Sequence, residues 1–201
     1  MSPELVAALG GAVAGGIIAV LGGIAQVFMQ GWISERGEIT CDAAAKELTF
    51  TFEPQTQDYS YNYKSFSSWK HAREFFNDNA ASAGWELRGI GYTFTANFLN
   101  TKGTNAAALE YSVRFWKGKR TVATSVPKAS TTEPTADKEP TDLLPEQAVA
   151  LPAENATGIY MRGILSDANA AKKALIEADK IEFTVRLSTD KIIGVELDRF
   201  P

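Results

Sequence analysis

The chain is poor in the two residue types that most often build metal and redox sites. Its 201 residues include one cysteine, Cys41, and one histidine, His71. A single cysteine excludes an intrachain disulfide, and a zinc site normally needs several cysteine or histidine ligands. A Cys41–His71 nucleophile pair is the remaining alternative, but we interpret the two residues as a buried strand cysteine and a histidine on a helix surface.

An excess of basic residues is also missing. Lys and Arg together number 20, Asp and Glu number 24, and the net charge is −4. Nucleic-acid-binding domains usually carry a basic patch or stripe. We therefore expect no nucleic-acid partner.

Catalytic motifs are absent from the sequence as well. It contains no phosphate-binding loop, no Gly-x-Ser-x-Gly segment and no zincin helix. Catalysis needs groups that converge on one cleft. The candidate acids and bases instead fall where solvated polar faces are expected, and they are Asp78, Glu86, Glu110, Lys70 and Arg73. We therefore expect a protein that is not an enzyme and has no cofactor.

Charged residues are absent from a long N-terminal run. Leu5–Ile33 contains no Asp, Glu, Lys or Arg, and a helix needs ~20 apolar residues to cross a bilayer. The preceding residues include Glu4 but no basic residue, unlike a cleaved signal peptide. The run predicts a single transmembrane helix at residues 5–33, surrounded by the lipid bilayer. The alternative is a buried hairpin of helices that breaks at Gly22-Gly23.

Small residues recur at every fourth position of this run, at Ala7, Gly11, Gly15, Ala19 and Gly23. In a helix these positions form one stripe along which a second helix can approach closely, and such packing drives helix association in lipid. We therefore expect contacts with other transmembrane helices, either from a second copy of the chain or from subunits of a complex.

The basic residues that flank the run indicate its orientation. Arg36 and Lys46 follow it, whereas no basic side chain precedes it. Because basic residues near a span tend to stay in the cytoplasm, this predicts a single-pass protein of the cell membrane whose folded part lies on the cytoplasmic side.

Residues 38–120 alternate between strand and helix patterns. Leu48–Phe52 shows period-two apolar spacing, and a short strand at Glu38–Asp42 is expected to pair with it across Ala43–Lys46. Apolar residues at helical spacing predict a helix that starts near Ser67 and ends at Gly84. Further strands are expected around Tyr92 and from Leu109 to Phe115. The predicted core comprises Phe50, Phe75, Trp85, Leu87, Val113 and Phe115.

The segment Ala83-Gly84-Trp85-Glu86-Leu87 carries a resemblance to a known kind of domain. A helix that closes on these residues, a loop of variable length and a final strand with a basic end resemble a family of short uncharacterised bacterial α+β domains. The resemblance covers about residues 59–120. It implies a small helix-on-sheet fold, with Gly84 as the end of the helix, and it implies no activity. An additional N-terminal hairpin and a long stretch at Thr93–Thr104 depart from the family pattern.

Residues 121–157 contain five of the eight prolines, together with many Thr, Ala and Glu residues. Such a composition predicts an extended tether. Residues 158–201 then predict a β-α-β-β unit, with a strand at Tyr160–Leu165, a helix capped by Ser166 or Asp167, and two alternating strands. The expected fold class is α+β, with a transmembrane helix, a small helix-on-antiparallel-sheet domain at 38–120 and a C-terminal β-α-β-β unit. The alternative is one α+β domain interrupted by a long loop.

Two functions remain compatible with these features. The first is a non-catalytic, membrane-anchored accessory or scaffold subunit of a membrane protein complex. The second is an anchored ligand-binding or sensing module that uses a surface of aromatic residues, Tyr59, Tyr61, Trp85 and Trp116. Exposure of two or more of these aromatics on one concave face would favour the second function.

Overall fold

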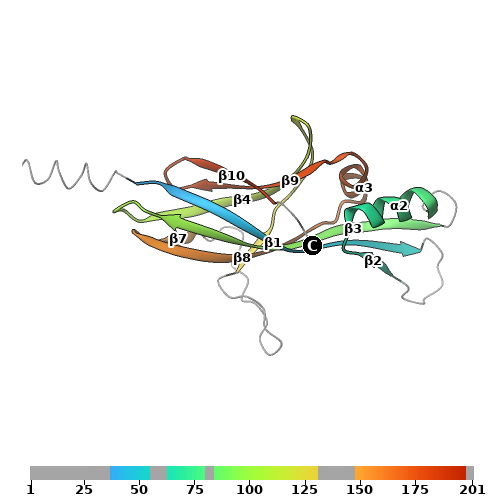
Figure 1. Ribbon diagram of the computed structural model, residues 1–201, viewed down its shortest axis with the longest axis horizontal. Coiled ribbons are helices and arrows are strands. Elements are labelled where there is room, and N and C mark those ends of the chain that lie inside the picture. The colour runs from blue at the N-terminus through green and yellow to red at the C-terminus, as the bar shows by residue number, and fades with distance from the viewer. Residues whose placement is uncertain (1–36, 55–62, 80–83, 131–147, 198–201) are drawn as a thin grey trace, which may run out of the picture.

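Two antiparallel β-sheets packed face to face form the body of the protein. The computed structural model describes residues 37–54, 63–79, 84–130 and 148–197, and these residues form the strands and helices shown in Figure 1. Antiparallel strands that bury one face alternate apolar and polar residues, as most strands of this chain do. The apolar residues of both sheets meet between the layers.

Sheet A contains the longest strands. Its order is β2 (Lys64–Phe66), β1 (Ile39–Pro54), β3 (Trp85–Asn100), β8 (Asn155–Leu165) and β6 (Lys128–Ser130). β1 and β3 have 16 residues each and pair along their whole length, with register shifts at Ala45/Glu47 and Thr51/Phe52. The expected hairpin between Glu38 and Phe52 is therefore wrong. Residues 43–45 remain extended because they pair with Phe94–Ala96 of β3, and the register shift follows at Lys46.

Sheet B covers part of the inner face of sheet A. Its order is β10 (Ile192–Glu196), β9 (Lys180–Leu187), β4 (Ala106–Lys117) and β5 (Arg120–Ser125). β7 (Val149–Leu151) pairs with the start of β4, and β5 pairs with its end. The far edge of β4 is thus covered by two short strands.

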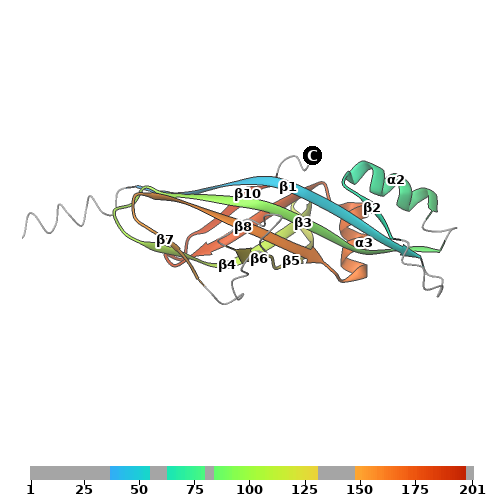
Figure 2. The same cartoon turned by 90° about the horizontal axis from the view of Figure 1, so that it is seen from below.

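The two helices extend the inner layer beyond sheet B. α2 (Trp69–Asn79) lies over the end of sheet A that contains β2, and α3 (Ala168–Glu177) lies between α2 and sheet B (Figures 1 and 2). The Asp167 side chain caps α3 by accepting a hydrogen bond from the Ala170 N–H, which selects one of the two caps predicted from the sequence, Ser166 and Asp167. Long strands thus pack on sheet B over one part of their length and on α2 over the other.

The core lies between these layers and includes the residues expected to be buried. Phe50, Leu87, Val113 and Phe115 are buried, and Phe75 and Trp85 are partly buried against them. Aromatic rings connect the layers, because Phe50 packs edge-on against Trp69 at 5.2 Å and Phe94 lies 5.0 Å from Phe183.

The expected α+β fold class is contradicted by this architecture. The described residues form mostly antiparallel strands, with two short helices. The chain crosses repeatedly between the sheets, so that β8 joins β3 in sheet A while β9 joins β4 in sheet B. Strands from the two expected units therefore interleave in both sheets. The reason is that apolar faces too small to form separate cores are buried against each other.

The expected tether also contains regular structure. β5, β6, β7 and the start of β8 fall within residues 121–157, and residues 131–147 lie outside the described part of the chain. Val122, Ala123, Ala129 and Leu151 are buried. The prolines misled the composition argument because Pro127 and Pro152 occur between strands and interrupt no ladder.

The expected single-pass membrane protein and its cell-membrane location are contradicted as well. Among the described residues, neither helix is long and apolar enough to cross a membrane. α2 has 11 residues and α3 has 10, whereas a span needs ~20. The predicted span at 5–33, and with it the stripe at Ala7, Gly11, Gly15, Ala19 and Gly23, lies outside the described residues.

Candidate functional site

One lateral edge of sheet A has an unpaired strand. β3 pairs with one side of β1 throughout, but β2 pairs on the other side only with Phe50–Phe52. Within the part of the chain that the structure describes, no second strand pairs with Ile39–Ala45. We call these seven residues the open edge. Alternate residues of an edge strand direct their N–H and C=O groups outward, where a further strand can reach them. The Ile39 carbonyl accepts a hydrogen bond from the Lys191 Nζ at 3.3 Å and the Ala43 N–H donates to Asp42 Oδ1 at 2.9 Å, so an added strand would displace these two partners.

The core beneath the open edge is only partly covered. Ile39, at the start of the open edge, is buried with 2% exposure, whereas Cys41, Ala43 and Ile193 of the neighbouring β10 are only partly buried. On the opposite side of the sandwich, Ile159 and Leu151 have 0% exposure. An additional strand beside β1 would therefore bury apolar surface as well as backbone groups.

On the opposite side of the sandwich the chain passes from one sheet to the other, and β6 pairs with Tyr160–Arg162 of β8. β5 of sheet B continues into β6 of sheet A through Val126 and Pro127. The Tyr92 hydroxyl donates to Ser125 Oγ at 2.8 Å, and Ser125 Oγ donates to the Ile164 carbonyl at 3.2 Å. These contacts join the two sheets at that side.

Features of β1 define the length and charge of the open edge. The register shift after Ala45 marks a bulge, and bulges commonly end strand pairing at sheet edges. On the outer face, Asp42 is exposed and its Oδ1 accepts a hydrogen bond from the Ala43 N–H at 2.9 Å. An added strand would thus find a carboxylate near the middle of the open edge.

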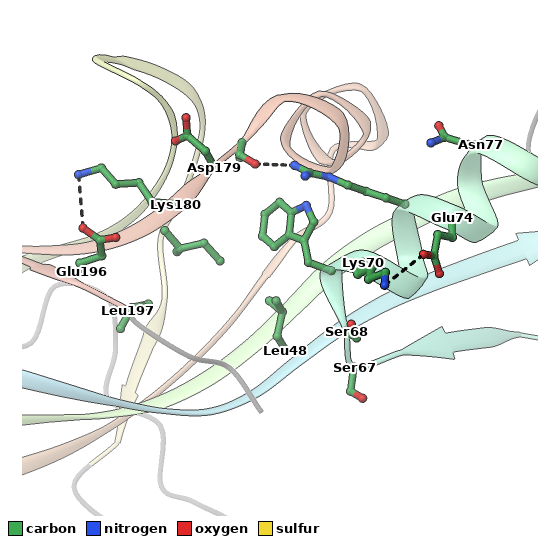
Figure 3. Close-up of a pocket in the computed structure, with 14 residues that line it drawn as sticks. Leu48, Ser67, Ser68, Lys70, Glu74, Asn77, Asp179, Lys180, Glu196 and Leu197 are labelled. Atoms are coloured by element: carbon green, nitrogen blue, oxygen red, sulfur yellow. Dashed lines mark hydrogen bonds and ion pairs between the residues drawn. The ribbon is translucent and has the colours of Figure 1, made fainter.

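A cleft of about 800 Å³ lies where β1 passes from sheet B to α2. Its apolar wall is formed by Leu48, Trp69, Ile181 and Leu197, and its rim carries polar residues of α2, β9 and β10 (Figure 3). Leu48 also belongs to β1 and lies three positions beyond the open edge. The cleft therefore lies a few residues along β1 from the end of the open edge.

The charges at the rim of this cleft are balanced. Lys70 lies 3.9 Å from Glu74, and Lys180 lies 3.7 Å from both Glu182 and Glu196. The nearby Asp179 accepts a hydrogen bond from the Gly118 N–H at 2.9 Å. Because each charged group already has a partner, the cleft is suited to a neutral or apolar group.

Trp69 and Arg73 connect α2 to the end of α3 beside the cleft. Trp69 Nε1 donates to the Leu175 carbonyl at 3.1 Å, and Arg73 donates to the carbonyls of Leu175 and Ala178. These bonds satisfy carbonyl groups at the end of α3, which a helix leaves unpaired. Burial lowers the pKa of Arg73 below its usual value, but a guanidinium stays charged in proteins. The sequence placed Arg73 on a solvated face and missed this role, because α3 is about a hundred residues away along the chain.

Replacing Arg73 by leucine is expected to lower the free energy of unfolding by about 1.5–3 kcal/mol, the usual range for losing a hydrogen bond to a charged group. The matched control is Lys70→Leu, one helical turn away, because the Lys70 side chain is 81% exposed. The control should change stability by less than about 0.5 kcal/mol. Urea unfolding measures both variants, and equal effects would show that Arg73 does not join the two helices.

The candidate catalytic residues do not converge. Cys41 belongs to β1 and His71 to α2, while Glu110 forms an ion pair with Arg186 on sheet B. Burial raises the pKa of the Cys41 thiol to about 12, which leaves little thiolate at neutral pH. No group of three or more His, Cys, Asp or Glu residues that could hold a metal occurs among the described residues.

The structure describes two of the four residues of the expected aromatic surface. Trp85 lies near α2, where its ring is 5.9 Å from Phe75 and 4.9 Å from the Lys64 Nζ. Trp116 belongs to β4 of sheet B, and the Lys180 Nζ lies 5.7 Å from its ring. The structure does not bring these two residues together. Tyr59 and Tyr61 lie outside the described residues, so the four-residue surface stays a prediction.

Sequence reasoning did not find the open edge. The residues 39–45 were expected to form part of a local hairpin, which would have paired them. An edge strand is recognised only when the partners of every strand are known.

In comparisons with known proteins, no family model matches the chain and no curated protein is similar to it in sequence. The resemblance drawn from Gly84-Trp85-Glu86-Leu87 therefore stays a prediction.

Proposed function

We propose that this protein is a non-catalytic binding module that takes up an extended segment of a partner protein at the open edge of β1. Such a module would act as a scaffold or accessory component. The observation that carries the proposal is the run Ile39–Ala45, which has no second partner strand among the described residues. Peptides commonly bind exposed sheet edges by adding a strand.

The chemistry of the expected segment follows from the two faces of the open edge. Every second side chain would point inward over Cys41, Ala43 and Ile193, so these positions favour apolar residues. The alternate side chains would point outward beside Asp42, where a basic residue is favoured, because opposite charges across neighbouring strands stabilise pairing by about 0.2–1 kcal/mol.

The size of the open edge sets the expected strength of binding. Seven residues at ~3.3 Å per residue extend over about 23 Å. An interface of this length is small, and small interfaces are typical of weak or transient complexes, with dissociation constants on the order of micromolar. A module that exchanges partners is consistent with such an affinity.

A displayed library of random ten-residue peptides selected on the folded protein tests the proposal. Enriched peptides should show alternating apolar residues with an outward basic residue, and they should slow amide exchange within residues 40–45. Ala43→Lys, which places a charge on the inward row, should weaken binding about tenfold or more, a loss of about 1.4 kcal/mol. The matched control is Ala44→Lys, because Ala44 is the exposed outward neighbour.

Three outcomes would contradict the proposal. The library could yield no enriched peptide, the enriched peptides could protect amides only outside residues 40–45, or Ala43→Lys and Ala44→Lys could weaken binding equally. Asp42→Lys provides an independent check. It should change the preferred outward residue from basic to acidic, because it reverses the charge that the added strand meets.

A further inference from the structure

The cleft beside Trp69 lies at the end of the open edge and is suited to an anchoring side chain. We infer that it is the specificity pocket for one large aromatic side chain of the same bound segment. The inference rests on the proposed strand addition, and it adds that the segment is chosen by an aromatic residue next to its alternating part.

The position of the cleft along β1 supports this assignment. Leu48 is three residues beyond Ala45, and three strand residues extend over about 10 Å. A strand that pairs with the open edge and runs in the direction of β1 therefore reaches the cleft within about three residues. The side chain at that point would enter the space between β1, α2 and β9 (Figure 3).

Trp69 is held in position before anything binds. Its indole N–H donates to the Leu175 carbonyl, Phe50 packs edge-on at 5.2 Å, and the Arg73 guanidinium lies 5.3 Å from its ring. A rigid aromatic wall loses little entropy on binding, and such preorganisation favours affinity. Trp69 can thus contact an incoming ring without rearrangement.

The size and polarity of the cleft favour an aromatic side chain over a charged one. Its volume of about 800 Å³ lies in the range of ligand pockets, about 300–1,000 Å³, and is ample for one ring. Leu48, Ile181 and Leu197 form the floor of the cleft but are only 3–5% exposed, so Trp69 is its main accessible apolar surface. The lysines of the rim already have acidic partners at 3.7–3.9 Å, so an added charge would gain little. Aromatic pairs contribute about 0.5–1.5 kcal/mol beyond the area they bury.

Two serines of the same segment provide a matched test. Ser65 and Ser67 are both exposed. Ser67 lines the cleft, whereas Ser65 belongs to β2 and pairs with Thr51 of β1. The probes are a library-selected peptide with its aromatic residue and the same peptide with alanine at that position. Ser67→Trp should fill the mouth of the cleft and weaken binding of the aromatic peptide about tenfold. Ser65→Trp should leave its affinity within about twofold.

The alanine peptide separates this inference from the proposed function. It should bind about tenfold more weakly than the aromatic peptide, should still protect residues 40–45, and should be insensitive to Ser67→Trp. If aromatic and alanine peptides bind equally, or if Ser67→Trp weakens both to the same extent, the specificity pocket is disproved while strand addition stands. If neither peptide protects residues 40–45, the proposed function itself fails.

Discussion

Replacing Phe115 by alanine is expected to lower the free energy of unfolding by about 3–5 kcal/mol, the range observed when a fully buried phenylalanine is truncated. Phe115 has 0% exposure and lies on β4, where sheet B meets the helical end of the core. Its ring is 6.4 Å from Trp69 and 6.5 Å from Tyr92, so it contacts both α2 and sheet A. The substitution leaves a cavity at the junction of three elements, which cannot all move inward to fill it.

Urea unfolding of Phe115→Ala beside Leu99→Ala measures this effect. Leu99 is a large apolar residue of β3, but it is 48% exposed, so its truncation should change stability by less than about 1 kcal/mol. A change below about 0.5 kcal/mol for Phe115→Ala would show that β4 does not pack as described. Both variants lose a large apolar side chain, but only Phe115→Ala removes a buried one, so the difference in their unfolding free energies reports the effect of burial.

Asn100→Ala is expected to destabilise the fold by about 2–4 kcal/mol, because each buried polar group left unpaired costs about 1–3 kcal/mol. Asn100 is 1% exposed at the end of β3. Its Nδ2, which carries two hydrogens, lies 3.0–3.1 Å from the carbonyl oxygens of Thr104, Leu151 and Pro152 and shares its hydrogen bonds among them, and its Oδ1 accepts from the Lys102 N–H at 3.0 Å. One side chain therefore joins the β3–β4 loop to β7.

Asn97→Ala provides the matched control for this prediction. Asn97 is an exposed asparagine on the same strand, three residues earlier, so its loss should cost less than about 0.5 kcal/mol. Thermal unfolding of both variants gives the comparison. If Asn100→Ala unfolds at the temperature of Asn97→Ala, the loop does not depend on this hydrogen-bond network.

Local elements of the chain follow from the sequence alone. Helical spacing after Ser67 and Ser68 predicted α2, and Asp167 predicted the start of α3. Period-two spacing predicted β9 and β10 at nearly their observed positions. These features depend on residues that are neighbours along the chain, since capping and amphipathic spacing act within a few turns or strand residues. The inward positions of Phe50, Leu87, Val113 and Phe115 were predictable for the same reason.

The candidate site depends on contacts that no local pattern specifies. The sequence predicted that Ala43–Lys46 connects the two strands of a hairpin, but Ala43 and Ala45 are extended because they pair with β3, about fifty residues later. Arg73 was assigned to solvent because its acceptors, Leu175 and Ala178, become neighbours only when α3 docks on α2.

Residues 121–157 show the same dependence. Their composition predicted a tether, yet β5 and β7 are stabilised by pairing with β4, and β6 by pairing with β8.

The sequence by itself determined both helices and several of the strands, including β9 and β10, and which of their faces are apolar. Only the tertiary structure decided which strands pair, and therefore that Ile39–Ala45 has no second partner strand within the described part of the chain. The physical reason is that strand pairing joins distant segments, and the same alternating face can be buried by any strand of compatible register. The choice among partners is made by the whole core, in which both sheets and both helices must bury their apolar faces together.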